Sequence, residues 1–235
     1  MRPGILIVNP EYPYTFKLSE GGPFFWMGET SWCLMSNAVS YSDGTFQQYI
    51  TKRIQQKFNN INFVLGTGGL PVGTHNPENE GGNLWISQIQ QRINPDFFKW
   101  MDKRIAYMDS LQMGIGFYIT WAQHFAVFTR AEFERFESYL IARYAAFPIV
   151  YWVIVGEYDE AGSISDYNYH GQVIDAKDPY GHLISNHPNH SDSENLGTSR
   201  IFANQEWFSF VLQQLPQNPS NSSAGEANNY GSSKN

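Results

Sequence analysis

The sequence predicts an α/β fold whose parallel sheet is buried on both faces. Short apolar runs, typical of strands, alternate along the chain with longer segments whose apolar residues recur at helical spacing. The strands are continuously apolar, which is typical of a parallel sheet covered by helices. A doubly wound nucleotide-binding sheet also fits this pattern, but no glycine-rich phosphate turn follows the first strand. The pattern therefore favours a barrel of (β/α) units.

Five apolar runs are predicted to form buried strands, and a weaker run is predicted to form a sixth. They cover residues 24–28, 61–66, 113–121, 149–155 and 183–185, with the weaker one at 207–212. The first run is followed by Glu29, Thr30, Ser31 and Trp32, where a phosphate-binding turn would need glycines.

Helical spacing predicts helices over residues 45–58, 95–112 and 130–146, and a weaker one over 167–176. Asn94 is placed to cap the second helix, and Pro95 occupies its first turn, where the missing N–H does no harm. Thr129 and Glu132 have the spacing of a capping box at the start of the third helix.

The predicted units stop short of a complete TIM-type (β/α)8 barrel. About six strands are recognisable, whereas a whole barrel typically needs ~250 residues. After Pro216 the chain is rich in Gln, Asn, Ser and Gly, and such a composition cannot bury a core. We therefore expect an incomplete barrel domain over residues 1–216 and a polar, disordered tail over 217–235. The open edges of such a sheet favour self-association.

The composition excludes several classes of partner. The formal net charge is −7 and no cluster of Lys and Arg occurs, so we expect no nucleic-acid partner. No stretch approaches the ~18 apolar residues of a membrane helix, so no membrane partner is expected. The apolar run at 5–8 is too short for a signal peptide, and the compartment is left open. The chain has 17 Phe, 14 Tyr and 7 Trp, and aromatic side chains often line sugar-binding clefts.

Glu157 is the strongest candidate for a catalytic carboxylate. Reacting groups of a (β/α) barrel lie at the C-terminal ends of its strands, and Glu157 follows the run 149–155 after Gly156 alone. Partial desolvation at such a position raises the pKa of a carboxyl toward the value that a general acid needs. The alternative is a structural carboxylate that pairs with an arginine or caps a turn. Asp159 and Glu160 are predicted to be solvated loop charges.

Other strand-end side chains are candidates for binding a substrate. Trp32, Trp121 and Tyr158 have the character of apolar walls of a sugar site, although each could instead fill the core. Glu29 could hydrogen-bond a substrate hydroxyl, or it could pair with an arginine such as Arg53. The sequence leaves these alternatives open.

Asn186 and His187 follow the fifth predicted strand and are further candidates for binding a substrate hydroxyl. His187 could also assist proton transfer. The spacing of His182, His187 and His190 matches no standard zinc pattern, so we expect no metal and no other cofactor. No Gly-x-Ser-x-Gly elbow occurs, which removes the nucleophile of an α/β-hydrolase.

Two sequence blocks are distinctive: Pro-Phe-Phe-Trp-Met-Gly-Glu-Thr-Ser-Trp at 23–32 and Asp-Pro-Tyr-Gly-His-Leu-Ile-Ser-Asn-His-Pro at 178–188. Further blocks lie at 58–63, 94–109, 119–121, 144–157 and 206–214. In this order they resemble the first six strand regions of the apiosidase-like glycoside hydrolases, a family with a (β/α)8-barrel catalytic domain. The resemblance extends over residues 5–214 and ends after the sixth strand.

The resemblance implies hydrolysis of a glycosidic bond in a plant or microbial polysaccharide, with carboxylates at the ends of strands four and seven. Glu157 stands at the first position and Glu29 at an acidic position of strand one, where Asp is commoner in both cases. No seventh strand is recognisable, and Glu226 is a faint match for the second carboxylate, without an apolar strand before it. A non-catalytic carbohydrate-binding barrel and an inactive fragment of such a hydrolase are the alternatives.

Overall fold

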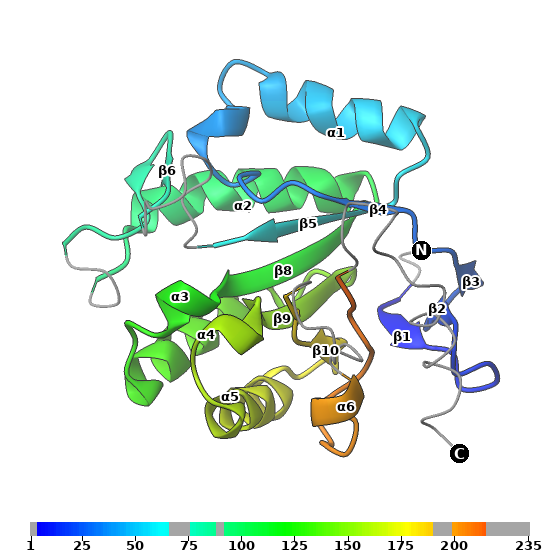
Figure 1. Cartoon of the computed structure of the whole chain (residues 1–235). Helices are drawn as coiled ribbons and strands as arrows, with labels where there is room; N and C mark the ends of the chain where they lie inside the picture. Colours follow the sequence, from blue (N-terminus) through cyan, green and yellow to red (C-terminus); the bar gives the residue numbers. More distant parts are fainter. Residues whose placement is uncertain (1–3, 66–75, 88–91, 190–198, 215–235) are drawn as a thin grey trace, which may run out of the picture.

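The computed structural model describes residues 4–65, 76–87, 92–189 and 199–214. Its centre is a five-stranded parallel sheet with the order β10-β9-β8-β5-β4 (Figure 1). The strands are β4 (Gly28–Thr30), β5 (Asn60–Val64), β8 (Gly114–Trp121), β9 (Val150–Gly156) and β10 (Ile184–Ser185). Their spatial order follows the chain without the reversal of a doubly wound sheet, as in the wall of a (β/α) barrel. The barrel is not closed within the described residues.

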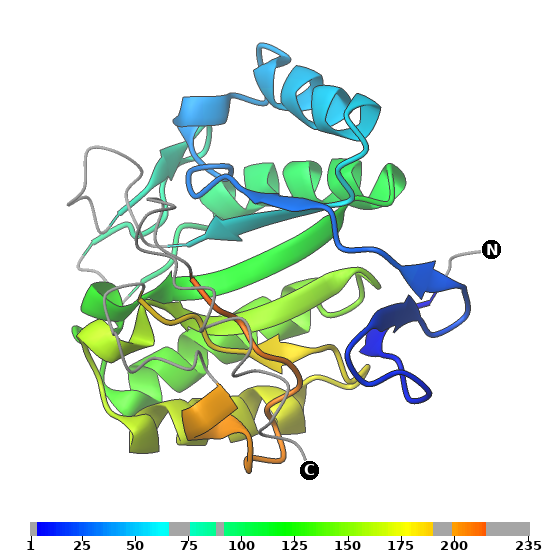
Figure 2. The same ribbon diagram turned by 45° about the vertical axis from the view of Figure 1, so that its right-hand side comes forward.

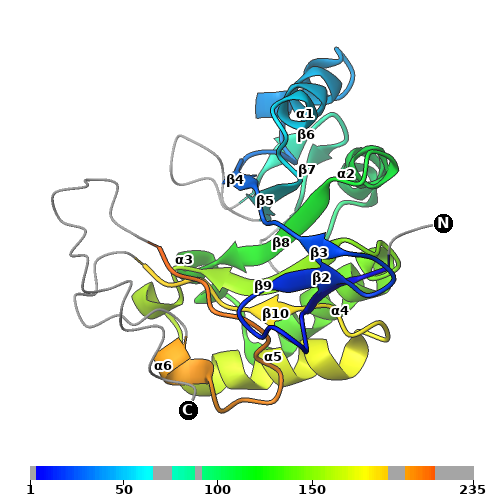
Figure 3. The same ribbon diagram turned by 90° about the vertical axis from the view of Figure 1, so that its right-hand side faces the viewer.

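Four helices connect these strands and lie along the outer side of the sheet (Figures 2 and 3). They are α1 (Thr45–Gln55), α2 (Pro95–Ser110), α4 (Arg130–Tyr144) and α5 (Ile164–Lys177). Their existence was predicted, but α5 begins at Ile164 rather than at residue 167, because the side chain of Ser163 caps it by accepting from the N–H of Asp166. Among the described residues, no helix has the length and apolar character to cross a bilayer.

The short elements complete the described fold. They are η1 (Asn37–Val39), the hairpin of β6 (Glu78–Asn79) and β7 (Gly82–Asn83), α3 (Ala122–Phe125), η2 (Tyr158–Glu160) and α6 (Ser199–Phe202). The residues of the predicted tail over 217–235 lie outside the described part of the chain.

The predicted caps of α2 and α4 are confirmed. The Asn94 side chain accepts a hydrogen bond from the N–H of Asp96, and Pro95 occupies the first helical position. Thr129 and Glu132 form a reciprocal capping box. Each motif satisfies N–H groups that have no partner within the helix, so the sequence sets where both helices begin.

The sheet buries two faces, and neighbouring strand residues alternate between them. Phe117 and Trp152 are register partners on the outer face, and both belong to the large apolar cluster shared with the helices. Tyr118 and Val153 are the next pair, and they belong to a smaller inner cluster. N-terminal residues such as Leu6 and Phe16 also belong to that inner cluster, as do Phe210 and Leu212.

An N-terminal antiparallel sheet, which the sequence did not predict, covers part of the inner face. It contains β1 (Leu6–Val8), β2 (Phe16–Leu18) and β3 (Pro23–Phe24). The ring of Trp26, just after β3, packs on Tyr151 near the start of β9, with centroids 4.9 Å apart. This small sheet therefore lies at the N-terminal end of the barrel strands, opposite the end where β8 meets α3 (Figure 1).

The predicted first strand at 24–28 is wrong in position. Phe24 belongs to β3, and the barrel strand begins at Gly28. Between them the backbone is held by a side chain: Asn59 accepts from the N–H of Met27 at 3.0 Å and donates to the carbonyl of Phe25 at 2.7 Å. The chain passes between two sheets here, so the apolar run does not form one continuous strand.

The predicted sixth strand at 207–212 has no regular strand hydrogen bonding, although it lies beside β10. The N–H of Ser209 donates to the carbonyl of Ile184 at 2.9 Å. The hydroxyl of Ser185 donates to the carbonyl of Phe210 at 2.7 Å, and the N–H of Ile184 donates to the hydroxyl of Ser209 at 2.9 Å. Serine side chains thus replace part of the backbone ladder.

Candidate active site

Glu157 occupies the first position after β9, at the C-terminal end of the sheet. Its backbone lies in the left-handed region, with φ 52° and ψ 52°. A side chain with a Cβ adopts this region at a cost, and such residues cluster at functional sites. The turn ends the strand abruptly and leads directly into η2, so the carboxyl group is held at the strand end.

Trp121, the last residue of β8, holds the carboxylate. Its indole N–H donates to Oε2 of Glu157 at 3.0 Å. Gly156 makes this approach possible, because a Cβ built at that position would lie 2.2 Å from a carbon of the Trp121 ring. The glycine that precedes Glu157 therefore provides space for the indole that binds Glu157.

Three further rings surround this pair. Trp32 packs edge-on against Trp121 and Tyr118, with centroids 5.1 and 5.2 Å apart. The ring of His187 lies 5.5 Å from that of Tyr118 and 6.0 Å from those of Trp32 and Trp121. Side chains from β8 and from the segments after β4 and β10 thus form one aromatic wall beside Glu157. Flat apolar surfaces next to polar groups suit sugar rings.

The electrostatic environment favours the protonated form of Glu157. Burial raises the pKa of its carboxyl, and the negative charge of Glu160 raises it further, while the hydrogen bond from Trp121 acts in the opposite direction. Burial lowers the pKa of His187 to about 4, so this imidazole is neutral at pH 7. A carboxyl with a raised pKa in an aromatic setting can serve as a proton donor.

Asn186 and His187 extend the hydrogen bonding between β10 and β9, the first through its side chain and the second through its backbone. Oδ1 of the fully buried Asn186 accepts from the N–H of Val155 at 3.1 Å, and the N–H of His187 donates to the carbonyl of Val155 at 3.2 Å. Nδ1 of His187 lies 3.5 Å from the backbone N of Glu157. The candidates Glu157, Trp32, Trp121, Asn186 and His187 are therefore gathered at one end of the sheet.

Two candidates point elsewhere. Glu29 lies within β4 rather than after it, and its carboxylate accepts from Tyr49 and Arg53 of α1, as in the structural alternative. The ring of Tyr158 is buried against Tyr167 and Phe202 in the outer apolar cluster, which is its core-filling alternative. Both side chains face the helical layer, away from the aromatic wall.

The candidate second carboxylate, Glu226, lies outside the described residues.

One member of the aromatic wall, Tyr118, was missed because it stands inside an apolar run. The alternation within that strand could have identified it: Phe117 and Ile119 face the helices, so Tyr118 must face inward. Among the described residues, no group of His, Cys, Asp or Glu could hold a metal ion.

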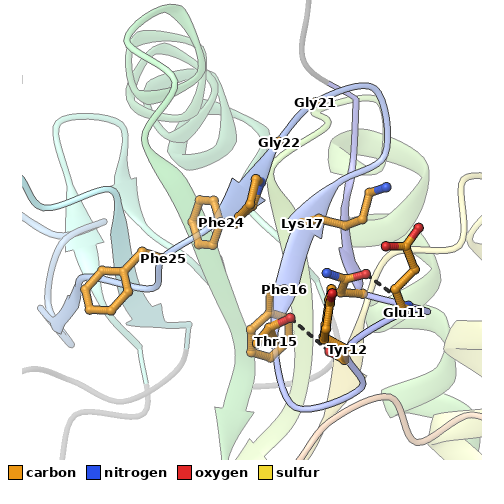
Figure 4. A pocket seen from close by; sticks show the side chains of 11 residues that line it. Glu11, Tyr12, Thr15, Phe16, Lys17, Gly21, Gly22, Phe24 and Phe25 are labelled. Atoms are coloured by element: carbon orange, nitrogen blue, oxygen red, sulfur yellow. Dashed lines mark hydrogen bonds between the residues drawn. The ribbon is translucent and has the colours of Figure 1, made fainter.

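A groove of about 480 Å³ lies on the N-terminal sheet (Figure 4). Its lining combines aromatic rings such as Tyr12 and Phe24 with the charged side chains of Glu11 and Lys17. Phe24 packs on Trp26, and Trp26 packs on the N-terminal half of β9, whereas Glu157 follows the C-terminal end of that strand. The groove and the aromatic wall are separate features.

The model of the family described as apiosidase-like, catalytic domain, matches residues 13–233. No curated protein sequence matches this chain. A family 5 glycoside hydrolase from Bacteroides vulgatus has a similar structure, with a TM-score of 0.71 and 22% identity over 91% of this chain and 44% of that one. A second glycoside hydrolase of that organism, described as putative, gives a TM-score of 0.64 and 21% identity over 83% of this chain and 40% of its own.

A family 5 mannosidase from Rhizomucor miehei, solved in complex with mannosyl-fructose, has a TM-score of 0.55 and 16% identity, over 81% of this chain and 57% of that one. Identities this low show a shared fold, which in these glycoside hydrolases is the (β/α)8 barrel. The chain spans less than half the length of the two Bacteroides proteins. On the match over residues 13–233, the chain belongs to the apiosidase-like family of glycoside hydrolase catalytic domains.

Proposed function

We propose that this protein takes part in hydrolysing a glycosidic bond of a plant or microbial polysaccharide, with Glu157 as the general acid. The hydrogen bond from Trp121 to Glu157 beside an aromatic wall is the observation that carries the proposal. The glycosidic oxygen must be protonated as it leaves, and Glu157 combines a raised pKa with a position beside flat apolar rings. The mannosidase complex with a sugar supports a carbohydrate ligand on this fold.

Family 5-like barrels and other glycosidases commonly need a second carboxyl group, which attacks the anomeric carbon or activates water. Separations of roughly 5 Å and of 6.5–9.5 Å correspond to retention and inversion. In this chain Glu226 is the candidate, on the strength of its sequence context alone. Glu157 is thus the proposed acid on its position at the end of β9, and Glu226 is the proposed second carboxylate; mutagenesis tests both.

The decisive experiment is a hydrolysis assay of the purified chain on a panel of plant polysaccharides, in parallel with Glu157→Gln and Glu29→Gln. Both substitutions change a carboxylate to an amide, but Glu29 is engaged with α1. We expect Glu157→Gln to reduce turnover by at least about 100-fold, and Glu29→Gln to retain it. Full activity of Glu157→Gln would refute the role of Glu157.

Carbohydrate binding without turnover is the second candidate function. It is favoured by the aromatic wall of Trp32, Tyr118 and Trp121, which offers flat faces to a sugar ring whether or not a bond is cleaved. This function needs the aromatic wall but not the acid. Isothermal titration with oligosaccharides distinguishes the two: binding that is abolished in Trp32→Ala but unaffected in Glu157→Gln, with no hydrolysis, would support the binding function.

A further inference from the structure

Glu160 is a second acidic residue near Glu157, three positions further along the turn that follows β9. In η2 the N–H of Glu160 donates to the carbonyl of Glu157 at 3.0 Å. This backbone hydrogen bond folds the chain back on itself within one turn. The turn brings Glu160 close enough for its charge to act on Glu157.

Neutral amides fix the Glu160 carboxylate at both oxygens. The side-chain amide of Gln123, in α3, donates to Oε2, and that of Asn189 donates to Oε1 at 2.5 Å. Oδ1 of Asp159 accepts from the backbone N–H of Asn189 at 2.7 Å. Asp159 and Glu160, which follow β9, thus connect the segment after β8 to the segment after β10. Glu160 is exposed, as the sequence predicted for a loop charge, but it is not free.

The carboxyl groups of Glu160 and Glu157 belong to residues one turn apart, and the amides of Gln123 and Asn189 fix the first of them in place. Besides burial, the negative charge of Glu160 raises the pKa of the Glu157 carboxyl. Two carboxylates held close together cannot both ionise easily, and the proton resides on the group that loses more by becoming charged. Glu157 is the more buried member, and Glu160 is the solvated one.

We propose that Glu160 is a positioning residue for the general acid: held by Gln123 and Asn189 one turn from Glu157, its charged carboxylate keeps the proton on Glu157. The proposal rests on the proposed function only in naming Glu157 an acid. The underlying claim, that the charge of Glu160 controls the protonation of Glu157, is a property of the folded chain and can be measured without turnover.

Other groups that face Glu157 define the controls. Asp159, on the same turn, is a more weakly interacting carboxylate. From the segment after β10, His187 contacts the backbone of Glu157, and its pKa of about 4 leaves the imidazole neutral at pH 7. From β8, Trp121 donates to the carboxylate and carries no charge. Within the described residues, these groups come from the turn that contains Glu157, from the segment after β10 and from β8.

The test is a carboxyl-carbon NMR titration of the full chain labelled with carbon-13 at glutamate side chains. The Glu157 signal is assigned by its loss in Glu157→Gln. Glu160→Gln removes the charge and keeps one acceptor oxygen, and the amide that faces its new NH2 group can flip to accept from it. Asp159→Asn is the matched control. We expect Glu160→Gln to move the titration midpoint of Glu157 down by at least about 0.5 pH unit, and Asp159→Asn to move it by less than half as much.

An unchanged midpoint in Glu160→Gln, or an equal change in Asp159→Asn, would overturn the proposal. If Glu160→Gln does not fold, Gln123→Leu releases the same carboxylate from an exposed position and must lower the midpoint too. If the hydrolysis assay shows no role for Glu157 but the midpoint falls, the proposed function fails and the coupling stands. If hydrolysis is observed, the alkaline limb of the pH profile must move to lower pH in Glu160→Gln, since a general acid acts only while protonated.

Discussion

The indole of Trp121 and the carboxylate of Glu157 meet across 3.0 Å at the ends of adjacent strands. Their positions follow from the sheet register, in which Trp121 pairs with Gly156. The strand residue before the acid thus lies beside the tryptophan that binds the acid. The space at Gly156 therefore sets where the Trp121 indole lies, and the hydrogen bond from that indole affects the protonation of Glu157.

Trp121→Phe keeps an aromatic ring but removes the indole donor. Because the hydrogen bond from Trp121 favours the ionised form of Glu157 and thus lowers its pKa, we expect the titration midpoint of Glu157 to rise. We also expect a loss of about 1–2 kcal/mol in the free energy of unfolding from the smaller ring. Carboxyl-carbon NMR measures the midpoint. Trp32→Phe, which changes the neighbouring ring without a bond to Glu157, should leave it in place.

Gly156→Ala should displace the Trp121 ring, since the new methyl group would lie 2.2 Å from it. The β9 backbone cannot move away easily, so we expect a cost of about 1–3 kcal/mol in unfolding free energy. Urea unfolding followed by tryptophan fluorescence reports it. Gly22→Ala is the control, because its new methyl group would meet no atom within 4 Å. Equal stability of the two variants would contradict the close packing.

Glu157→Gln should stabilise the folded protein slightly at pH 7. The folded-state pKa of Glu157 is raised, so the folded protein holds this proton more tightly than the unfolded chain does. Wild-type stability is then lost as the pH rises above the unfolded value of about 4.3 and through the folded value. After solvent screening the gain of the variant is a few tenths of a kcal/mol. Unfolding at pH 4 and pH 7 tests this, and the advantage should be absent at pH 4.

Glu137 and His170 form a buried pair between α4 and α5, with Oε1 and Nδ1 2.8 Å apart. Burial raises the pKa of Glu137 and lowers that of His170 to about 4, so the pair is uncharged at neutral pH and the carboxyl donates to the ring. Glu137→Gln retains a donor and should cost within about 1 kcal/mol, whereas Glu137→Leu leaves a buried acceptor unpaired and should cost about 1–3 kcal/mol more. Guanidinium unfolding compares them; equal losses would show that the hydrogen bond does not matter.

Self-association through the open sheet edge is a further expected outcome. Strand β4 ends the sheet order, and within the described residues no strand pairs with its outer edge. Unpaired edges offer backbone hydrogen bonds to a second chain. Sedimentation velocity over a range of protein concentrations should show a rising average mass, and a constant monomer mass would exclude this mode.

Much of the fold and part of the site could be predicted from the order of residues alone. The alternation of apolar strands with helices, the caps at Asn94 and Thr129, and the place of Glu157 after β9 depend on local patterns, and the structure contains them. Local chemistry suffices there because a cap satisfies N–H groups within the next turn. A carboxylate directly after a buried strand must likewise lie at the sheet edge.

Only the tertiary structure decided three features. They are the faces to which the side chains of Glu29 and Tyr158 point, the break in the predicted first strand, and the N-terminal sheet. A barrel strand is buried on both faces, so its apolar run shows burial without showing which face each side chain takes. Register sets that choice, and it depends on partners far along the chain: Arg53 for Glu29, and Asn59 for the segment before Gly28. Sequence determined which residues are buried or stand at strand ends; long-range packing decided which of them meet around Glu157.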